Sequence, residues 1–185
     1  MGKIEPLAQL PQDTKDYFKK LPGYDTLRVV LAEKVILVEG PTDELIIQRA
    51  YVDEYGVLPI TQGIDVIVVD SLAFKRYCDI AVLLNKSVII VTDNDGNIKT
   101  NIEDKYADYI GKDNLTFIYA ENEQLNTIEP SVLEVNCENG EPSVTFREVI
   151  SKRNSMMSKS KQEILEFMKK INYPEYIKNA IKQCN

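Results

Sequence analysis

The 185-residue sequence contains no histidine. This absence excludes Ser-His-Asp and Cys-His catalysis, zinc or haem sites that use histidine ligands, and imidazole general bases. Any catalysis by this chain must therefore use carboxylates, lysines or metal-bound water.

Cysteine is scarce, and long apolar runs are absent. Cys78, Cys137 and Cys184 lie far apart and form no C-x-x-C pair, which argues against a disulfide framework and a structural zinc site. No apolar run approaches the roughly 20 residues that cross a bilayer, and the first residues lack the apolar stretch of a signal peptide. We therefore expect a cytoplasmic protein with reduced cysteines and no membrane association.

Charge is distributed unevenly along the chain. The net charge is −7, from 22 basic and 29 acidic residues. The segment from Ser151 onward carries +5, which leaves −12 for residues 1–150. One interpretation is a solvated, lysine-rich helical tail. The other is a basic surface beside an acidic cluster, which suits a metal-dependent enzyme that acts on a phosphodiester.

Short β-branched apolar runs alternate with longer amphipathic stretches. The apolar runs predict strands at residues 34–38, 64–69, 87–92 and 114–119. The other stretches predict helices at residues 12–21, 43–55, 71–84 with Ser71 as its cap, 101–110, 160–171 and 174–183. Continuous apolar strands joined through helices favour an α/β fold, in which an open parallel sheet has helices on both faces.

The length fits one domain with a small extension. We expect a lead-in helix within residues 1–30 and an α/β core at residues 31–135. Residues 136–185 would form a helical, lysine-rich extension of the same domain that begins with a loop at residues 136–142.

The first predicted strand ends in Glu39-Gly40-Pro41-Thr42-Asp43. Ligands bind parallel α/β sheets at the carboxyl ends of the strands, so Glu39 and Asp43 are candidate functional residues. The alternative is structural: Thr42 or Asp43 caps the following helix, and Glu39 is a solvated edge residue.

The third predicted strand ends in Asp93-Asn94-Asp95-Gly96. The D-x-D spacing directs two carboxylates from one short loop into the same crevice, although an Asx turn is the simpler alternative. An EF-hand loop is excluded, because the sixth position from the first Asp is Ile98 and not glycine. Haloacid-dehalogenase phosphatases also place a nucleophile in D-x-D-G after a strand, but that motif normally comes first in the chain and continues with threonine. Here it follows the third strand and continues with Asn97.

The two acidic motifs would meet if the first and third strands are neighbours in the sheet. Unit charges of like sign at about 4 Å repel by roughly 4 kcal/mol at an effective dielectric near 20, so clustered carboxylates need a counter-charge. A divalent metal ion supplies one. Oxygen ligands select Mg²⁺, Mn²⁺ or Ca²⁺ over zinc or copper. The sequence therefore predicts a metal site made by Glu39, Asp43, Asp93 and Asp95.

Glu-Gly after a first strand and D-x-D after a later one together resemble the Toprim fold of topoisomerases, bacterial primases and several nucleases. Residues 35–44 (VILVEGPTDE) and 91–96 (VTDNDG) are most similar to the OLD (overcoming lysogenization defect) family of ATP-dependent endonucleases. Residues 17–28 resemble the segment that leads into the family's Toprim domain, and residues 173–181 resemble its closing helix.

The resemblance implies two-metal cleavage of DNA. Glu39 and Asp43 would serve one Mg²⁺ or Mn²⁺ ion and Asp93 and Asp95 the other, and Ca²⁺ can occupy such sites. The family also uses a late lysine to steady charge on the phosphate; Lys159 fits this place best, and Lys161 is its rival. The catalytic set would thus comprise Glu39, Asp93, Asp95 and Lys159.

A further acidic residue is expected at the edge of the site. Related domains carry an acid where this chain has Glu129, which is therefore a candidate; the alternative is that Glu129, as the residue before Pro130, simply shapes a turn.

One departure from the family concerns ATP. Family members carry an ABC-type ATPase, whereas this sequence has no G-x-x-x-x-G-K-[ST] loop. We therefore expect DNA as partner, with the ATPase in a domain or subunit outside this sequence; an oligomer is compatible with these features. Two alternatives stay open: a haloacid-dehalogenase-type phosphatase with Asp93 as nucleophile, and a non-catalytic module that binds DNA or a partner and cuts only with the ATPase.

Overall fold

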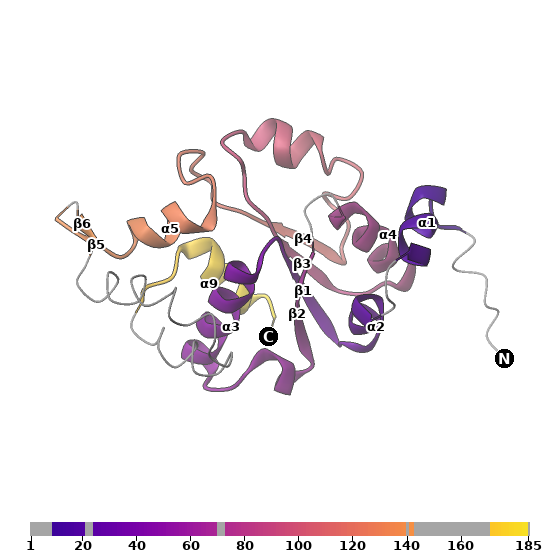
Figure 1. Cartoon of the computed structure of the whole chain (residues 1–185), viewed down its shortest axis with the longest axis horizontal. Helices are drawn as coiled ribbons and strands as arrows, with labels where there is room; N and C mark the ends of the chain where they lie inside the picture. Colours follow the sequence, from indigo (N-terminus) through magenta and orange to yellow (C-terminus); the bar gives the residue numbers. More distant parts are fainter. Residues whose placement is uncertain (1–8, 21–23, 70–72, 140, 143–170, 185) are drawn as a thin grey trace.

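A four-stranded parallel sheet forms the centre of the computed structural model, which describes residues 9–20, 24–69, 73–139, 141–142 and 171–184 (Figure 1). Its strands are β1 (Lys34–Val38), β2 (Ile64–Val68), β3 (Val88–Val91) and β4 (Leu115–Ile118). They lie in the order β2-β1-β3-β4. The predicted parallel α/β sheet is therefore confirmed, and the strands that carry the two acidic motifs are direct neighbours.

Alternate side chains of the sheet form two separate hydrophobic cores. On one face, Ile36 and Val38 of β1 pack with residues from the helices α3 (Pro41–Tyr55), α5 (Ile128–Glu134) and α9 (Glu175–Lys182). The closing helix α9 thus belongs to the core, through Ile177 and Ala180 among others.

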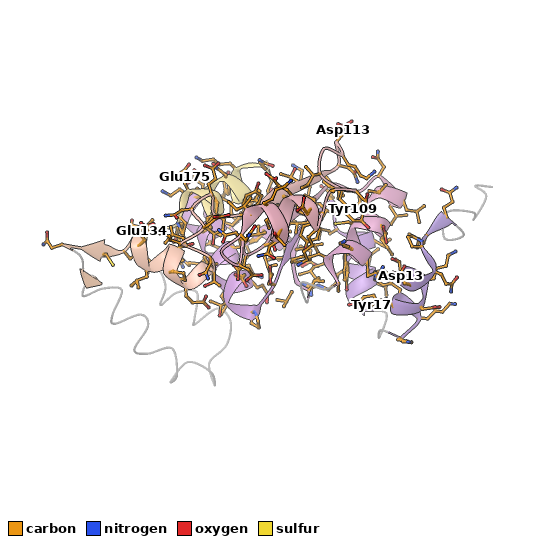
Figure 2. All side chains as sticks on the ribbon, turned by 90° about the horizontal axis from the view of Figure 1, so that it is seen from above. Asp13, Tyr17, Tyr109, Asp113, Glu134 and Glu175 are labelled. Carbon is orange, nitrogen blue, oxygen red and sulfur yellow. The ribbon has the colours of Figure 1, made fainter. Side chains whose placement is uncertain are left out.

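The other face of the sheet is covered by helices α1 (Gln12–Lys20), α2 (Tyr24–Leu31) and α4 (Phe74–Leu84). Figure 2 shows Asp13 and Tyr17 of α1 at the opposite end of the molecule from Glu134 of α5 and Glu175 of α9. Helices on both faces explain why the strands are continuous apolar runs rather than alternating ones.

The sequence did not indicate two of these helices. Helix α2 contains the pair Val29-Val30, and β-branched residues are weak helix formers, yet Val29 is buried against the sheet. Helix α5 includes Pro130 in its first turn, where a missing N–H costs no hydrogen bond. The interpretation of Glu129 as part of a turn before a proline is therefore wrong, because Glu129 lies in the first turn of a helix.

Three local predictions also differ from the structure. Helix α4 begins at Phe74 with Ala73 as its N-cap residue, which is later than the expected start at Ser71; Ser71 itself lies outside the described residues. The helix expected at residues 101–110 begins as a π-helix, η3 (Lys99–Asp104), and continues as turns. The loop expected at residues 136–142 contains a short hairpin of β5 (Cys137–Glu138) and β6 (Glu141–Pro142). A 3-10 helix, η2 (Pro59–Gln62), precedes β2.

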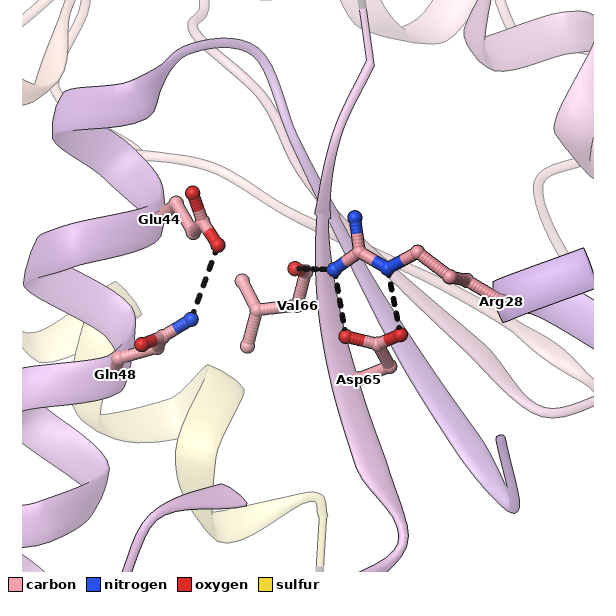
Figure 3. Close-up of polar contacts among 5 residues, drawn as sticks. All are labelled: Arg28, Glu44, Gln48, Asp65 and Val66. Carbon is pink, nitrogen blue, oxygen red and sulfur yellow. Dashed lines mark hydrogen bonds and ion pairs between the residues drawn. The ribbon is translucent and has the colours of Figure 1, made fainter. Parts of the chain in front are cut away.

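Arg28 of α2 caps the outer edge of β2 (Figure 3). Its guanidinium makes a bidentate ion pair with Asp65, at 2.9 and 2.7 Å, and donates to the Val66 carbonyl at 2.9 Å. A groove of about 470 Å³ lies beside this edge; Glu44 and Gln48 of α3 are among the residues that line it. Charged side chains are a common feature of edge strands, where unpaired backbone groups could otherwise pair with another chain.

Residues 136 and 172 are held together by hydrogen bonds although they are 36 positions apart. The buried Asn136 side chain donates to the Asn172 carbonyl at 2.9 Å and accepts the Asn172 amide at 2.7 Å. Close by, the Tyr173 hydroxyl donates to Asp53 of α3 at 2.6 Å. The chain thus returns to the core through α9. The predicted functional lysines, Lys159 and Lys161, and nearly all of the helix expected at residues 160–171 lie outside the described residues.

No helix in the described ranges is long and apolar enough to cross a membrane.

Candidate metal centre

The Glu39 carboxylate connects the carboxyl ends of β1 and β3. Its Oε1 atom accepts a hydrogen bond from the Thr92 hydroxyl at 2.5 Å and another from the Asp93 amide at 3.0 Å. Both donors directly follow β3, and the parallel register of β1 with β3 brings them to Glu39. The Glu-Gly motif and the D-x-D motif are therefore in direct contact.

Asp43 lies in the first turn of α3 and completes a capping box. Its Oδ2 atom accepts the Gly40 amide at 2.8 Å, and Gly40 is the N-cap residue. A Cβ atom on Gly40 would lie 3.1 Å from this oxygen, closer than an ordinary contact, so glycine leaves room for the Asp43 carboxylate. The N-cap residue is thus Gly40 and neither Thr42 nor Asp43, although the Asp43 side chain caps the helix from its third position and uses one carboxylate oxygen to do so.

The middle residue of the D-x-D motif anchors the loop. Asn94 is 1% exposed; its amide nitrogen donates to the Ala120 and Asn122 carbonyls at 2.8 and 3.2 Å, and its oxygen accepts the Gly96 amide at 2.8 Å. This last bond is an Asx turn, centred on Asn94 rather than on an aspartate. Asp95 follows with a positive φ of 48° and an exposed side chain, while Asp93 is half-buried.

Burial and neighbouring negative charges raise the pKa values of Asp93 and Asp43. Burial raises the pKa of Asp93 to about 7, and the negative charges of Glu39, Asp43 and Asp95 add to the effect. Burial raises the pKa of Asp43 to about 6, with a contribution from Glu39. Like charges and desolvation act in the same direction here, and such coupling is characteristic of functional sites.

Two residues from later in the chain interact electrostatically with the same cluster. Glu129 is exposed, accepts a hydrogen bond from Thr127 at 3.0 Å, and contributes to the raised pKa of both Asp43 and Asp93. Burial raises the pKa of Tyr176 on α9, and the charges of Asp93 and Asp43 raise it further. The assignment of Glu129 to the edge of the site stays a prediction, and nothing in the sequence indicated Tyr176.

The donor chemistry suits Mg²⁺, Mn²⁺ or Ca²⁺, because every candidate ligand is a carboxylate oxygen. The side chains are not gathered, however: among the described residues, no three acidic or cysteine side chains lie close enough to hold one ion together. Glu39 and Asp43 each use one oxygen for bonds within the protein and keep a second one. The ligand type and the negative charge of these residues therefore fit a divalent ion. Binding of one ion by several of these carboxylates would require their side chains to move closer together.

The sequence did not indicate Thr92 or Asn94 as part of this site. The only available signal was position, since Thr92 directly precedes the D-x-D motif and Asn94 lies within it. The role of each depends on a neighbouring strand or loop, which a local pattern does not specify.

The chain is similar to known proteins in part of its sequence and in its fold. Residues 30–95, which include both acidic motifs, match the family model described as overcoming lysogenization defect protein-like, TOPRIM domain. The fold is similar to the C-terminal region of the Burkholderia pseudomallei OLD protein, with a TM-score of 0.53 and 16% identity over 83% of this chain and 96% of that one. The C-terminal region of the Xanthomonas campestris pv. campestris OLD protein gives a TM-score of 0.49 and 18% identity over 85% of this chain and 94% of that one. No curated protein sequence matches the chain.

The family model covers the segment in which Glu39 contacts Asp93, and the solved structure from Burkholderia pseudomallei shows the same fold around it. The part of this chain that carries the two acidic motifs therefore matches an OLD-like TOPRIM domain in sequence, and the chain is similar in fold to the C-terminal region of an OLD protein.

Proposed function

We propose that this chain is the nuclease domain of an OLD-family system and cleaves DNA phosphodiester bonds with Mg²⁺ or Mn²⁺. The observation that carries the proposal is the contact between the two acidic motifs, in which the Asp93 amide donates to Glu39 at 3.0 Å. The match of residues 30–95 to an OLD-like TOPRIM domain supports it. The resemblance to the OLD family implies DNA cleavage, and we extend this activity to the present chain.

We assign Glu39 and Asp43 to one metal ion and Asp93 and Asp95 to the other. When bound, a pair of ions would activate a water molecule and stabilise the leaving oxygen of an in-line displacement. The chain itself supplies oxygen ligands and holds them in place through the Thr92, Gly40 and Asn94 bonds. Glu129 would add a further carboxylate at the rim of the site.

A lysine would offset charge on the non-bridging oxygens of the phosphate. Lys159 is our first candidate and Lys161 the second, and both belong to the segment from Ser151 onward that carries +5. In this proposal residues 31–135 supply the metal ligands and residues 136–185 the phosphate contact.

Relaxation of supercoiled plasmid DNA in Mg²⁺ or Mn²⁺ tests the proposal. Asp93→Ala should abolish cleavage while the circular dichroism spectrum stays that of the wild type. Lys159→Ala should reduce turnover and Lys161→Ala should not, and the reverse pattern would move the assignment to Lys161. Undiminished cleavage by Asp93→Ala would refute the assigned site.

The phosphatase alternative is separated by a covalent intermediate. With Asp93 as nucleophile, a haloacid-dehalogenase-type enzyme forms a trappable aspartyl-phosphate and turns over small phosphomonoesters. A two-metal nuclease does neither. The family match includes Glu39 and Asp43, which the phosphatase mechanism does not require, and this favours the nuclease.

A second candidate function is a TOPRIM module that cuts only when a partner ATPase and DNA complete its site. One observation favours it: within the described residues, the acidic side chains do not yet form a shared ion site. Plasmid cleavage by this chain alone, compared with cleavage after the ATPase partner is added, separates the two functions.

A further inference from the structure

Thr92 is a buried residue that makes a short contact with the proposed site. Its side chain is 4% exposed, and its hydroxyl lies 2.5 Å from Glu39 Oε1. The Asp93 amide reaches the same oxygen at 3.0 Å. Two donors that directly follow β3 therefore hold one specific oxygen of Glu39, the residue that directly follows β1.

This arrangement limits how Glu39 can bind a cation. An oxygen that already accepts two hydrogen bonds has little remaining capacity, so the other oxygen, Oε2, is the one available to an ion. A carboxylate held in this way also has a fixed plane, which removes a rotational freedom that ion binding would otherwise have to restrict.

We propose that Thr92 is a positioning residue, which orients Glu39 so that Oε2 alone serves as a ligand to a divalent ion. This inference rests on the proposed function and adds to it a residue that touches neither ion nor substrate. Outer residues that hold a metal ligand commonly change affinity by about 10–100-fold when they are removed.

Three variants isolate the hydroxyl. Thr92→Val keeps the shape and removes the donor, whereas Thr92→Ser keeps the donor and removes a methyl group. Thr116→Val is the matched control, because Thr116 lies near the start of β4 in the same sheet, opposite Ile89, and not at the carboxyl ends that carry the proposed site.

Titration calorimetry with Mn²⁺ alone gives a readout that does not depend on catalysis. We expect Thr92→Val to bind Mn²⁺ about 10-fold more weakly, and Thr92→Ser and Thr116→Val to bind like the wild type. In plasmid cleavage, Thr92→Val should need about 10-fold more Mn²⁺ for half-maximal rate and should approach the wild-type rate at saturation. A purely structural role would lower the saturated rate or the stability without this shift in metal requirement.

The carboxyl carbon NMR shift of Glu39 in the metal-free protein provides an independent check. It should move in Thr92→Val and stay unchanged in Thr116→Val. If the wild type binds Mn²⁺ and Thr92→Val binds it with the same affinity, the inference about Thr92 is overturned, while the proposed function still stands. Absence of Mn²⁺ binding by the wild type would overturn both.

Discussion

At the scale of single residues, the acidic edge of the sheet opposes the stability of the metal-free fold. The pKa values of Asp93 and Asp43 are raised to about 7 and about 6, from an ordinary value of 3.8. A folded state that binds protons more tightly than the unfolded chain is stabilised by low pH. The contribution of these two groups is complete below about pH 4 and is lost as the pH rises through 6 to 7.

The first prediction is a pH-dependent effect of neutralising Asp93. In EDTA at pH 8, Asp93→Asn should raise the free energy of unfolding by ~1–2 kcal/mol, because it removes a desolvated charge that faces Glu39. At pH 4 the gain should vanish. Urea unfolding at both pH values measures the effect. Asp113→Asn, an exposed acid outside the cluster, is the control and should show no such pH dependence.

The positions of the acids could be predicted from the sequence, whereas their partners could not. Glu39 and Asp93 each follow an apolar strand, and strand ends are places where ligands bind, so a local pattern sufficed. The hydrogen bond from Thr92 depends on which strands are neighbours and in which register. The raised pKa values likewise depend on burial and on charges from four different segments of the chain.

At the scale of elements, Arg28 connects helix α2 to the edge strand β2. Its guanidinium satisfies both oxygens of Asp65 and the Val66 carbonyl with planar, forked geometry. Lysine has the same charge without the fork.

The second prediction concerns this edge contact. Arg28→Lys should lower the free energy of unfolding by ~1 kcal/mol, and Arg28→Ala by ~2 kcal/mol, because the half-buried Asp65 carboxylate loses its partner. In a urea double-mutant cycle, Arg28→Ala with Asp65→Ala should cost clearly less than the sum of the single changes. Additive losses would show that the two side chains do not interact.

The third prediction concerns the return of the chain to the core. Asn136→Ala should lower the free energy of unfolding by ~2 kcal/mol, because it leaves the Asn172 amide and two carbonyls without their partner. Asn179→Ala, an exposed asparagine on α9, is the matched control and should stay within ~0.5 kcal/mol of the wild type. Equal effects of both changes in thermal unfolding would contradict a specific role for Asn136.

The strands were easier to predict than the helices. Each predicted strand agrees with an observed one to within about one residue at either end, as at Lys34–Val38, because buried parallel strands are uninterrupted apolar runs. Helix α2 and helix α5 were missed, since Val29-Val30 and Pro130 are unfavourable local signals. Burial of Val29, and the place of Pro130 in a first turn, outweigh those local preferences.

At the scale of the whole molecule, the residues that stabilise the fold and the proposed metal ligands lie in different places. The two hydrophobic cores lie on the two faces of the sheet, under the helices, whereas the acidic residues of the proposed site follow the carboxyl ends of β1 and β3. The parallel class of the sheet could be predicted from the sequence. The strand order β2-β1-β3-β4 could not be predicted from the sequence. The sequence indicated only that the two acidic motifs would meet if β1 and β3 are neighbours.

The fourth prediction links metal binding to pH. Because carboxylates must lose their protons to bind a cation, Mg²⁺ affinity should fall between pH 8 and pH 6, by up to ~10-fold per pH unit for each proton displaced. At pH 8, Mg²⁺ at about 100 times its dissociation constant should stabilise the protein by ~2.7 kcal/mol. Thermal unfolding with and without Mg²⁺ at both pH values measures this, and equal stabilisation at pH 6 and pH 8 would contradict it.

Anomalous diffraction from crystals soaked in Mn²⁺ tests the central claim most directly. The account predicts manganese peaks at the carboxyl ends of β1 and β3, one within ligand distance of Glu39 and Asp43 and one within ligand distance of Asp93 and Asp95. It also predicts that the peak near Asp93 and Asp95 disappears in crystals of Asp93→Ala. Manganese bound elsewhere, or a wild-type acidic edge without a peak at saturating Mn²⁺, would contradict it.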